Sequence, residues 1–162
     1  MNTLILGVGN LLLSDEGVGV RAIEALEQRF VFPPGVTLQD GGTSGMELLE
    51  VMASRALIIV VDAVKSDSAP GSLFMLEDDD VPAFFSQRLS PHQLGLADVL
   101  MALRLTDEFP QRLVLLGIEP ESLAPGMALT PTVARAMEGA IAQVVRLLAA
   151  RGITLLPKEA CQ

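Results

Sequence analysis

Three apolar runs without polar alternation place the strongest constraint on how this chain can fold. They are Thr3–Val8, Ala56–Val61 and Arg112–Ile118, and the second, ALIIVV, runs directly into Asp62. Strands that are buried on both faces have such continuous apolar sequences, and they occur in parallel sheets that helices cover. We therefore expect these runs to be strands of a mainly parallel sheet.

Segments with a helical period alternate with these strands. Glu16–Phe30 places its apolar side chains on one helical stripe, and Ser14 and Asp15 before it are good N-cap residues. Thr130-Pro131 is a typical start of a last helix, which Gly152 closes. The other expected elements are strands at Val36–Gln39 and Ser72–Leu76, the latter near an edge, and helices at Gly45–Met52, Asp78–Phe85 and Gln93–Leu105.

This alternation predicts an α/β fold. It consists of a single three-layer domain, residues 1–162, in which a mainly parallel twisted sheet has helices on both faces. Residues 151–162 carry no motif, and we expect them to form a loosely ordered C-terminal end.

The net charge limits the binding partners that the chain can have, and the cysteine content indicates its cellular compartment. Asp plus Glu number 20 against 11 Lys plus Arg, a formal charge of -9, which argues against nucleic-acid binding and disfavours an anionic membrane surface. The single cysteine, Cys161, makes no intrachain disulfide, as in a reducing compartment. The first arginine is Arg21, and no apolar stretch approaches the roughly 20 residues of a membrane span. We expect a cytoplasmic protein without direct membrane insertion.

Polar residues follow the expected strands where a site would form. Ligands of open α/β sheets bind outside the carboxyl ends of the strands. Asp62 ends the third expected strand, Glu16 follows the first, and His92 begins a helix that could enter at the same edge. Two carboxylates and an imidazole suit a divalent transition metal with open coordination positions. Asp98, in the helix after His92, could orient the imidazole.

Each of these residues also has a structural explanation. Asp15 is explained as an N-cap, Glu16 by the dipole of the first helical turn, and Asp40 as a turn residue before two glycines. A solvent-facing position explains Asp98 equally well, and the acidic run Glu77–Asp80 is most simply a solvated loop or helix start. Asp62 is harder to explain, because burying a carboxylate without a partner is costly.

Other chemistries fit the sequence less well. Gly7-Val8-Gly9 resembles a dinucleotide-binding turn, but Leu12 stands at the third glycine position and the helix starts only near Glu16. The sequence has no GxxxxGK phosphate loop, and its GTSG segment is not a GxSxG nucleophile elbow. Cys161, near the end of the chain, is a poor candidate nucleophile.

The same residues carry a resemblance to a known family. The chain resembles the [NiFe]-hydrogenase maturation endopeptidases, and among them the proteases of membrane-bound uptake hydrogenases. The matching segments are Leu4–Asn10, Leu13–Val20, Asp40-Gly41-Gly42-Thr43, Val61-Asp62-Ala63, Ser90-Pro91-His92-Gln93, Gly117-Ile118-Glu119-Pro120 and Leu129-Thr130-Pro131.

The resemblance implies an endopeptidase that removes a short C-terminal peptide from the large-subunit precursor of a hydrogenase after nickel has been installed at its cysteine-bound site. The metal-contacting positions of the family map onto Glu16, Asp62 and His92, and Glu16 is Asp in some members. The Asp40-Gly41-Gly42 loop lies where the family is thought to engage substrate. Nickel would arrive with the precursor, and another divalent metal could replace it in a crystal.

The resemblance leaves the mechanism open. The metal could activate water and polarise the scissile carbonyl, or it could serve chiefly to show that the precursor is loaded. We favour the second role; Glu16 or Asp62 could act as a base, without an assignment between them. The alternatives from other classes are a non-catalytic metal-sensing chaperone or docking module with the same three residues, and a nucleotide-dependent α/β enzyme.

Overall fold

The computed structural model describes residues 2–87 and 91–158, and for residues 91–94 it describes the backbone alone. Ser90 of the Ser90-Pro91-His92-Gln93 motif and Cys161 lie outside the described residues. None of the helices in the described ranges combines the length and the apolar character that a membrane span requires.

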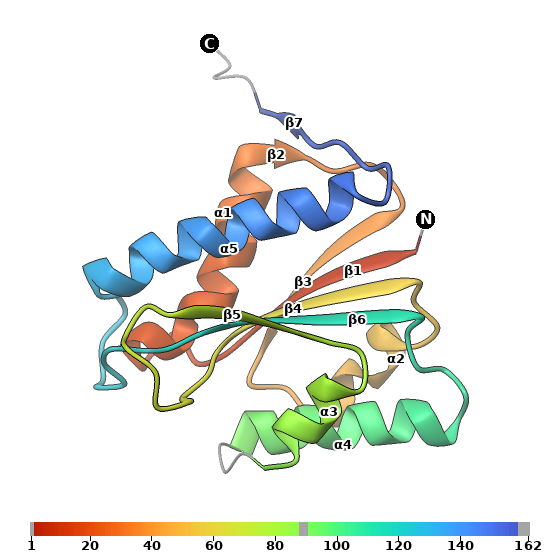
Figure 1. Ribbon diagram of the computed structural model, residues 1–162, viewed down its shortest axis with the longest axis horizontal. Helices are drawn as coiled ribbons and strands as arrows, with labels where there is room; N and C mark the ends of the chain where they lie inside the picture. Colours follow the sequence, from red (N-terminus) through yellow and green to blue (C-terminus); the bar gives the residue numbers. More distant parts are fainter. Residues whose placement is uncertain (1, 88–90, 159–162) are drawn as a thin grey trace.

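A five-stranded sheet with the order β3-β1-β4-β6-β5 forms the centre of the molecule (Figure 1). The three apolar runs are its central strands, and they pair in parallel as expected. Strand β3 pairs in parallel with β1 at one edge, and β5 pairs antiparallel with β6 at the other. The bounds are β1 Thr3–Val8, β3 Val36–Gly42, β4 Leu57–Ala63, β5 Leu73–Glu77 and β6 Arg112–Ile118.

Helices cover both faces of the sheet, which confirms the expected three-layer α/β architecture (Figure 1). Helices α1 and α5 pack on one face, and α2, α3 and α4 pack on the other. Alternate strand residues face the two layers, so Ile59 and Val61 pack against α1 and α5, whereas Ile58 and Val60 pack on the opposite side. The helices are η1 Ser14–Gly17, α1 Val18–Arg29, η2 Met46–Leu48, α2 Leu49–Met52, α3 Asp80–Phe85, α4 Pro91–Leu105 and α5 Pro131–Ala149.

The two strands that end at the expected site are longer than predicted. Strand β4 continues through Asp62 to Ala63, and β3 continues through Asp40 to Gly42. The expected turn at Asp40 is therefore wrong. The amide of Gly9 donates to the Gly42 carbonyl at 2.7 Å, which extends the pairing with β1, and the register shifts there because Gly41 is an inserted bulge residue.

Asp15 does not cap the helix that follows it, contrary to the prediction. Helix α1 begins only at Val18, after a 3-10 turn, with Gly17 at its N-cap. The Asp15 side chain is instead fully buried. It accepts hydrogen bonds from the amides of Glu121 and Ser122, both at 2.9 Å, and from the amide of Thr130 at 2.8 Å and the Thr130 hydroxyl. Asp15 thus ties the loop after β1 to the loop after β6.

Further hydrogen bonds join the same two loops. The Ser14 hydroxyl donates to the Ala124 carbonyl at 2.6 Å, and the Ser14 amide donates to the Gly126 carbonyl at 2.8 Å. The Gly126 amide returns a bond to the Leu12 carbonyl at 2.9 Å. Because these contacts lie around Glu16, they fix the path of the chain beside the expected site.

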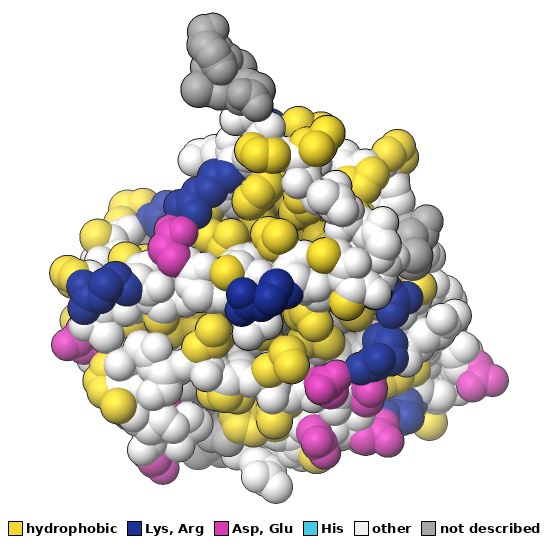
Figure 2. Space-filling model, turned by 45° about the horizontal axis from the view of Figure 1, so that its top comes forward, with side chains coloured by type: hydrophobic (Ala, Val, Ile, Leu, Met, Phe, Trp, Pro, Cys, Tyr) yellow, Lys and Arg dark blue, Asp and Glu magenta, His cyan; other side chains and the backbone are white. Residues whose placement is uncertain are grey.

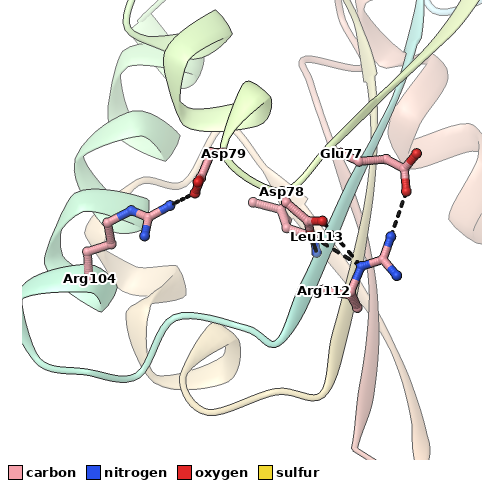
Figure 3. Close-up of polar contacts among 6 residues, drawn as sticks. All are labelled: Glu77, Asp78, Asp79, Arg104, Arg112 and Leu113. Atoms are coloured by element: carbon pink, nitrogen blue, oxygen red, sulfur yellow. Dashed lines mark hydrogen bonds and ion pairs between the residues drawn. The ribbon is translucent and has the colours of Figure 1, made fainter.

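The acidic run Glu77–Asp80 forms an exposed turn and the start of α3, as predicted, and three of its carboxylates also pair with arginines (Figure 3). Arg112 donates to Glu77 at 2.6 Å and contacts Asp78, and Asp78 also accepts from the Leu113 amide at 2.9 Å. Asp79 pairs with Arg104 of α4. These pairs fix the end of β5 and the start of α3. Helix α3 begins at Asp80, within the acidic run, where the sequence predicted a possible helix start.

The chain after α5 forms structure that the sequence did not predict. Strand β7, Leu156–Pro157, pairs antiparallel with β2, Phe30–Val31, in a separate two-stranded sheet. The Lys158 amide donates to the Arg29 carbonyl at 2.8 Å. Arg29 also makes a double ion pair with Glu138 of α5 at 2.6 and 2.8 Å, which lowers the pKa of the Glu138 carboxyl.

The hydrogen bonds of Asp15 predict that its substitution lowers the free energy of unfolding. We expect Asp15→Ala to lower the free energy of unfolding by about 3 kcal/mol or more, because it leaves three partly buried N–H groups without their acceptor. Asp15→Asn should also destabilise the protein, because each carboxylate oxygen accepts backbone bonds and an amide has only one acceptor oxygen. Urea unfolding monitored by circular dichroism measures both.

Glu24→Ala is the matched control for Asp15. Glu24 is a half-exposed acid on α1 whose partner among the described residues is Arg21, so its loss should change the free energy by no more than about 0.5 kcal/mol. An unfolding midpoint of Asp15→Asn equal to that of the wild type would contradict the structural role given to Asp15.

Candidate functional site

The crevice between the carboxyl ends of β1 and β4 is the position where this sheet architecture places a ligand. From β1 the chain passes through α1 to β3 on one side, whereas from β4 it continues to β5 and β6 on the other side. The strand order thus reverses between β1 and β4, and open α/β sheets bind ligands at such a point. Glu16 follows β1 and Asp62 lies near the end of β4.

Asp62 occupies a fully buried position at this edge. Its side chain is 0% exposed, within a strand in which every residue is buried. Its neighbours Val61 and Ala63 face α1 and α5, and Val60 faces the other layer. The alternation of a strand therefore places Asp62 on the face that α2, α3 and α4 cover. This is the face on which α4, the helix of His92, packs.

Glycines bring Glu16 to the same edge. A Cβ atom on Gly9 would lie 1.9 Å from the Glu16 carbonyl oxygen, and Gly9 has a φ of +137°. A Cβ atom on Gly19 would lie 2.2 Å from the Val61 carbonyl oxygen and 2.5 Å from the Val8 carbonyl oxygen. The first turn of α1 therefore rests directly on the ends of β1 and β4. Glu16, which is half-buried in η1, is held beside the strand that carries Asp62.

The backbone of His92 approaches from α4. His92 is the second residue of this helix, and its side chain lies outside the described part of the molecule. One turn later, the Gly95 Cα atom would lie only 3.5 Å from a Cβ atom on Gly45, in the loop that follows β3. The first turns of α4 thus lie against a loop of the carboxyl edge, as expected for this helix.

The Asp40-Gly41-Gly42 segment forms the outer side of this edge. The exposed Asp40 accepts a bond from the Gly42 amide at 2.9 Å. Gly41 is buried, and a Cβ atom on it would lie 3.0 Å from Leu6 Cδ1 and 3.2 Å from Val8 Cγ1. Gly42 has a φ of +51°, and a Cβ atom on it would have Asp40 Oδ1, at 3.8 Å, as its nearest neighbour.

Asp98 lies elsewhere on α4. It is exposed and lines a depression of about 250 Å³ between α3 and α4, together with Pro82, Ser86 and Arg104. Six positions along an α-helix separate Asp98 from His92, which corresponds to about 120° around the axis. Its role in orienting the imidazole stays a prediction.

Two further buried acids, Asp15 and Glu119, hold loops and are not part of the candidate site. Glu119, 3% exposed, accepts bonds from the Ser66 amide at 2.7 Å, the Ser66 hydroxyl at 2.8 Å and the Ser68 amide at 3.3 Å. It holds the loop after β4 as Asp15 holds the loop after β1. The sequence signal for Glu119 was its position directly after an apolar strand, which is the signal that singled out Asp62.

The arrangement therefore brings two carboxylates to the carboxyl ends of β1 and β4. It also places the start of α4, the helix that carries His92, at the same edge. Within the residues whose side chains are described, no group of three His, Cys, Asp or Glu side chains forms a metal cluster. The His92 side chain lies outside those residues. Oxygen donors of this kind can hold a cation or accept a proton from water.

Named relatives match almost the whole chain. Hydrogenase 2 maturation protease of Escherichia coli is 54% identical over 161 residues, which cover 99% of this chain and 98% of the relative. The hydrogenase expression/formation protein HupD of Rhodobacter capsulatus is 43% identical over 152 residues, which cover 93% of this chain and 72% of the relative.

Solved structures of hydrogenase maturation proteases have the same fold. The hydrogenase maturating endopeptidase HybD from E. coli superposes with a TM-score of 0.96 at 52% identity, covering 99% of both chains. The [NiFe] hydrogenase maturation protease HybD from Thermococcus kodakarensis gives a TM-score of 0.76 at 25% identity, covering 91% of this chain and 99% of that chain. A family model described as hydrogenase maturation protease matches residues 20–147. The chain belongs to the hydrogenase maturation protease family, and it is an endopeptidase.

Proposed function

We propose that the protein removes a short C-terminal peptide from the nickel-loaded large-subunit precursor of a [NiFe]-hydrogenase. The observation that carries this proposal is the fully buried Asp62 at the end of β4, with Glu16 held beside the same strand end by Gly9 and Gly19. The chain belongs to the hydrogenase maturation protease family, and its site carries carboxylates. Carboxylate oxygens bind cations, so such a site suits a substrate that itself brings a cation.

Nickel serves in this proposal as the element by which a loaded precursor is distinguished from an empty one. Glu16, Asp62 and His92 contact the ion that the precursor carries, and another divalent metal can take its place. Two carboxylates on neighbouring chain segments repel each other when both are ionised, and a cation between them relieves this repulsion. A precursor without nickel lacks that contact and is bound more weakly.

The peptide bond is then cleaved by water. Glu16 and Asp62 are the candidates for the general base. Glu16 is the half-buried member of the pair, whereas Asp62 is fully buried, so Glu16 has the better access to water. Asp40, Gly41 and Gly42 bind the substrate chain beside the crevice. The single cysteine favours action in the cytoplasm.

Cleavage by the purified protein tests the activity itself. Incubation with nickel-loaded precursor should give two products, the shortened large subunit and the released C-terminal peptide, both identified by mass spectrometry. Binding of the precursor without any cleavage would contradict the proposal and favour a docking module.

Substitutions at the three metal-contacting residues test the site. We expect Asp62→Asn and His92→Ala each to reduce the cleavage rate by more than about 100-fold, because loss of a partner that only orients a ligand already costs roughly 10–100-fold. Asp98→Ala should have a milder effect, within that lower range. Calorimetry with nickel on each variant reports metal uptake directly.

A thermal melt accompanies each of these variants. Asp62→Asn keeps the shape of the side chain, so we expect a cooperative melt. Wild-type cleavage rates from folded Asp62→Asn and His92→Ala proteins would exclude these residues from the site.

The glycines of β3 provide a test of substrate binding. Gly42→Ala should slow cleavage because it adds a methyl group to the backbone of the segment that binds the substrate, and its φ of +51° adds a cost of about 1 kcal/mol. Gly41→Ala should cost more stability, since its methyl group meets Leu6 and Val8 in the core. Rates and melting temperatures of both variants separate the two effects. Normal cleavage by Gly42→Ala would limit the segment to a structural role.

A further inference from the structure

The outer edge of β3 is a candidate surface for binding an extended chain. Strand β3 is the last strand of the sheet, and no other strand pairs with its outer side within residues 2–87 and 91–158. Its seven residues include no proline and no lysine, the residues that most often protect an edge from pairing with another chain. The edge ends beside the candidate site, because the carbonyl of its last residue, Gly42, accepts a hydrogen bond from the Gly9 amide after β1.

The register shows which main-chain groups face outward. The Thr3 amide donates to the Gly35 carbonyl at 3.0 Å, while Thr3 pairs with Val36 and Leu4 with Thr37. In a parallel ladder this pattern turns the N–H and C=O groups of Thr37 and Gln39 toward β1. The groups of the alternate residues, Leu38 and Asp40, therefore point away from the sheet.

These outward groups are available for hydrogen bonds. Among the described residues, no protein group pairs with the Leu38 N–H and C=O groups or with the Asp40 N–H group. The Asp40 carbonyl accepts only from the Gln39 side chain, at 3.1 Å, which can move aside. The spacing of two residues between Leu38 and Asp40 is that of successive bonding residues on a strand edge.

A groove runs beside the first half of β3. It has a volume of about 350 Å³, with Phe30, Phe32, Val36 and Leu38 among its apolar lining and Glu27 and Lys158 at its polar positions. Hydrophobic side chains are visible on the surface around the β2–β7 ribbon, at the top of the view in Figure 2. A strand added to β3 would direct every second side chain toward this groove.

We propose that the edge of β3 binds the C-terminal tail of the precursor as an additional strand, antiparallel to β3, with apolar side chains at alternate positions of the tail. This inference rests on the proposed function. The nickel-bound cysteine precedes the tail in the precursor, so the tail leaves the crevice and runs away from it. Because β3 runs toward the crevice, the tail is antiparallel to it, and its main chain bonds to Leu38 and Asp40.

A proline at position 38 tests the edge without altering the ladder to β1. Leu38→Pro removes an N–H group that faces outward, a position at which edge strands accept proline. Leu38→Ala is the matched control, because it shortens the same side chain and keeps the N–H group. We expect Leu38→Pro to cleave nickel-loaded precursor about tenfold more slowly than Leu38→Ala, the effect of about one lost hydrogen bond. Equal rates from two folded variants would overturn the proposal.

Amide hydrogen exchange in the wild-type protein gives a second test, which does not depend on how Leu38→Pro folds. The probe is a synthetic peptide with the sequence of the tail, used at a concentration that slows precursor cleavage. The proposal predicts slower exchange at the Leu38 and Asp40 amides and unchanged exchange at the Thr37 and Gln39 amides. Unchanged exchange at Leu38 and Asp40, or a tail peptide that does not slow cleavage at any concentration, would overturn it.

Cleavage by the wild-type protein distinguishes failure of this inference from failure of the proposed function. If the wild-type protein does not cleave the loaded precursor, the proposed function fails, and the inference about the tail fails with it. If the wild-type protein cleaves and the edge tests fail, the proposed function stands and the tail binds elsewhere.

Discussion

The close approach of α1 to the ends of β1 and β4 is the contact on which the rest of the site depends. The backbone at Gly19 lies so near the carbonyl oxygens of Val61 and Val8 that no side chain fits between them. Gly9 is in equally close contact with Glu16. Any larger residue at these positions would push α1 away from the sheet, and Glu16 would leave the strand end that carries Asp62.

Buried acids at the carboxyl edge have two distinct uses. Asp15 and Glu119 accept bonds from backbone amides and hold the loops after β1 and β4. Asp62 lies near the end of β4 and Glu16 follows β1, at the same carboxyl edge as these loops. A rigid frame of this kind keeps site residues near one geometry, which benefits both ion binding and catalysis. In our account the substrate then contributes the cation.

The sequence predicted the central sheet because its strands are apolar on both faces. It also predicted the Thr130-Pro131 helix start, and the Thr130 hydroxyl indeed accepts from the Val133 amide at 3.4 Å. It did not predict the partners of Asp15, since a cap and a long-range acceptor use the same residue type and Glu121 and Ser122 are over 100 residues away. The pairing of β2 with β7 was missed because two-residue strands have no period to detect.

For the site, the sequence indicated the residues and the structure indicates how two of them are brought to one edge. Periodicity could place Asp62 at a strand end, but the layer that it faces depends on the packing of the whole sheet. The bulge at Gly41 likewise depends on the register of β3 with β1, which no local pattern contains.

The central claim is that the protein recognises nickel in its substrate. The most direct measurement compares the affinity of the wild-type protein for the same precursor prepared with and without nickel, together with the affinities of Asp62→Asn. The account predicts that nickel strengthens binding to the wild-type protein and that this gain disappears in the variant. Equal wild-type affinities for the loaded and the empty precursor would contradict it.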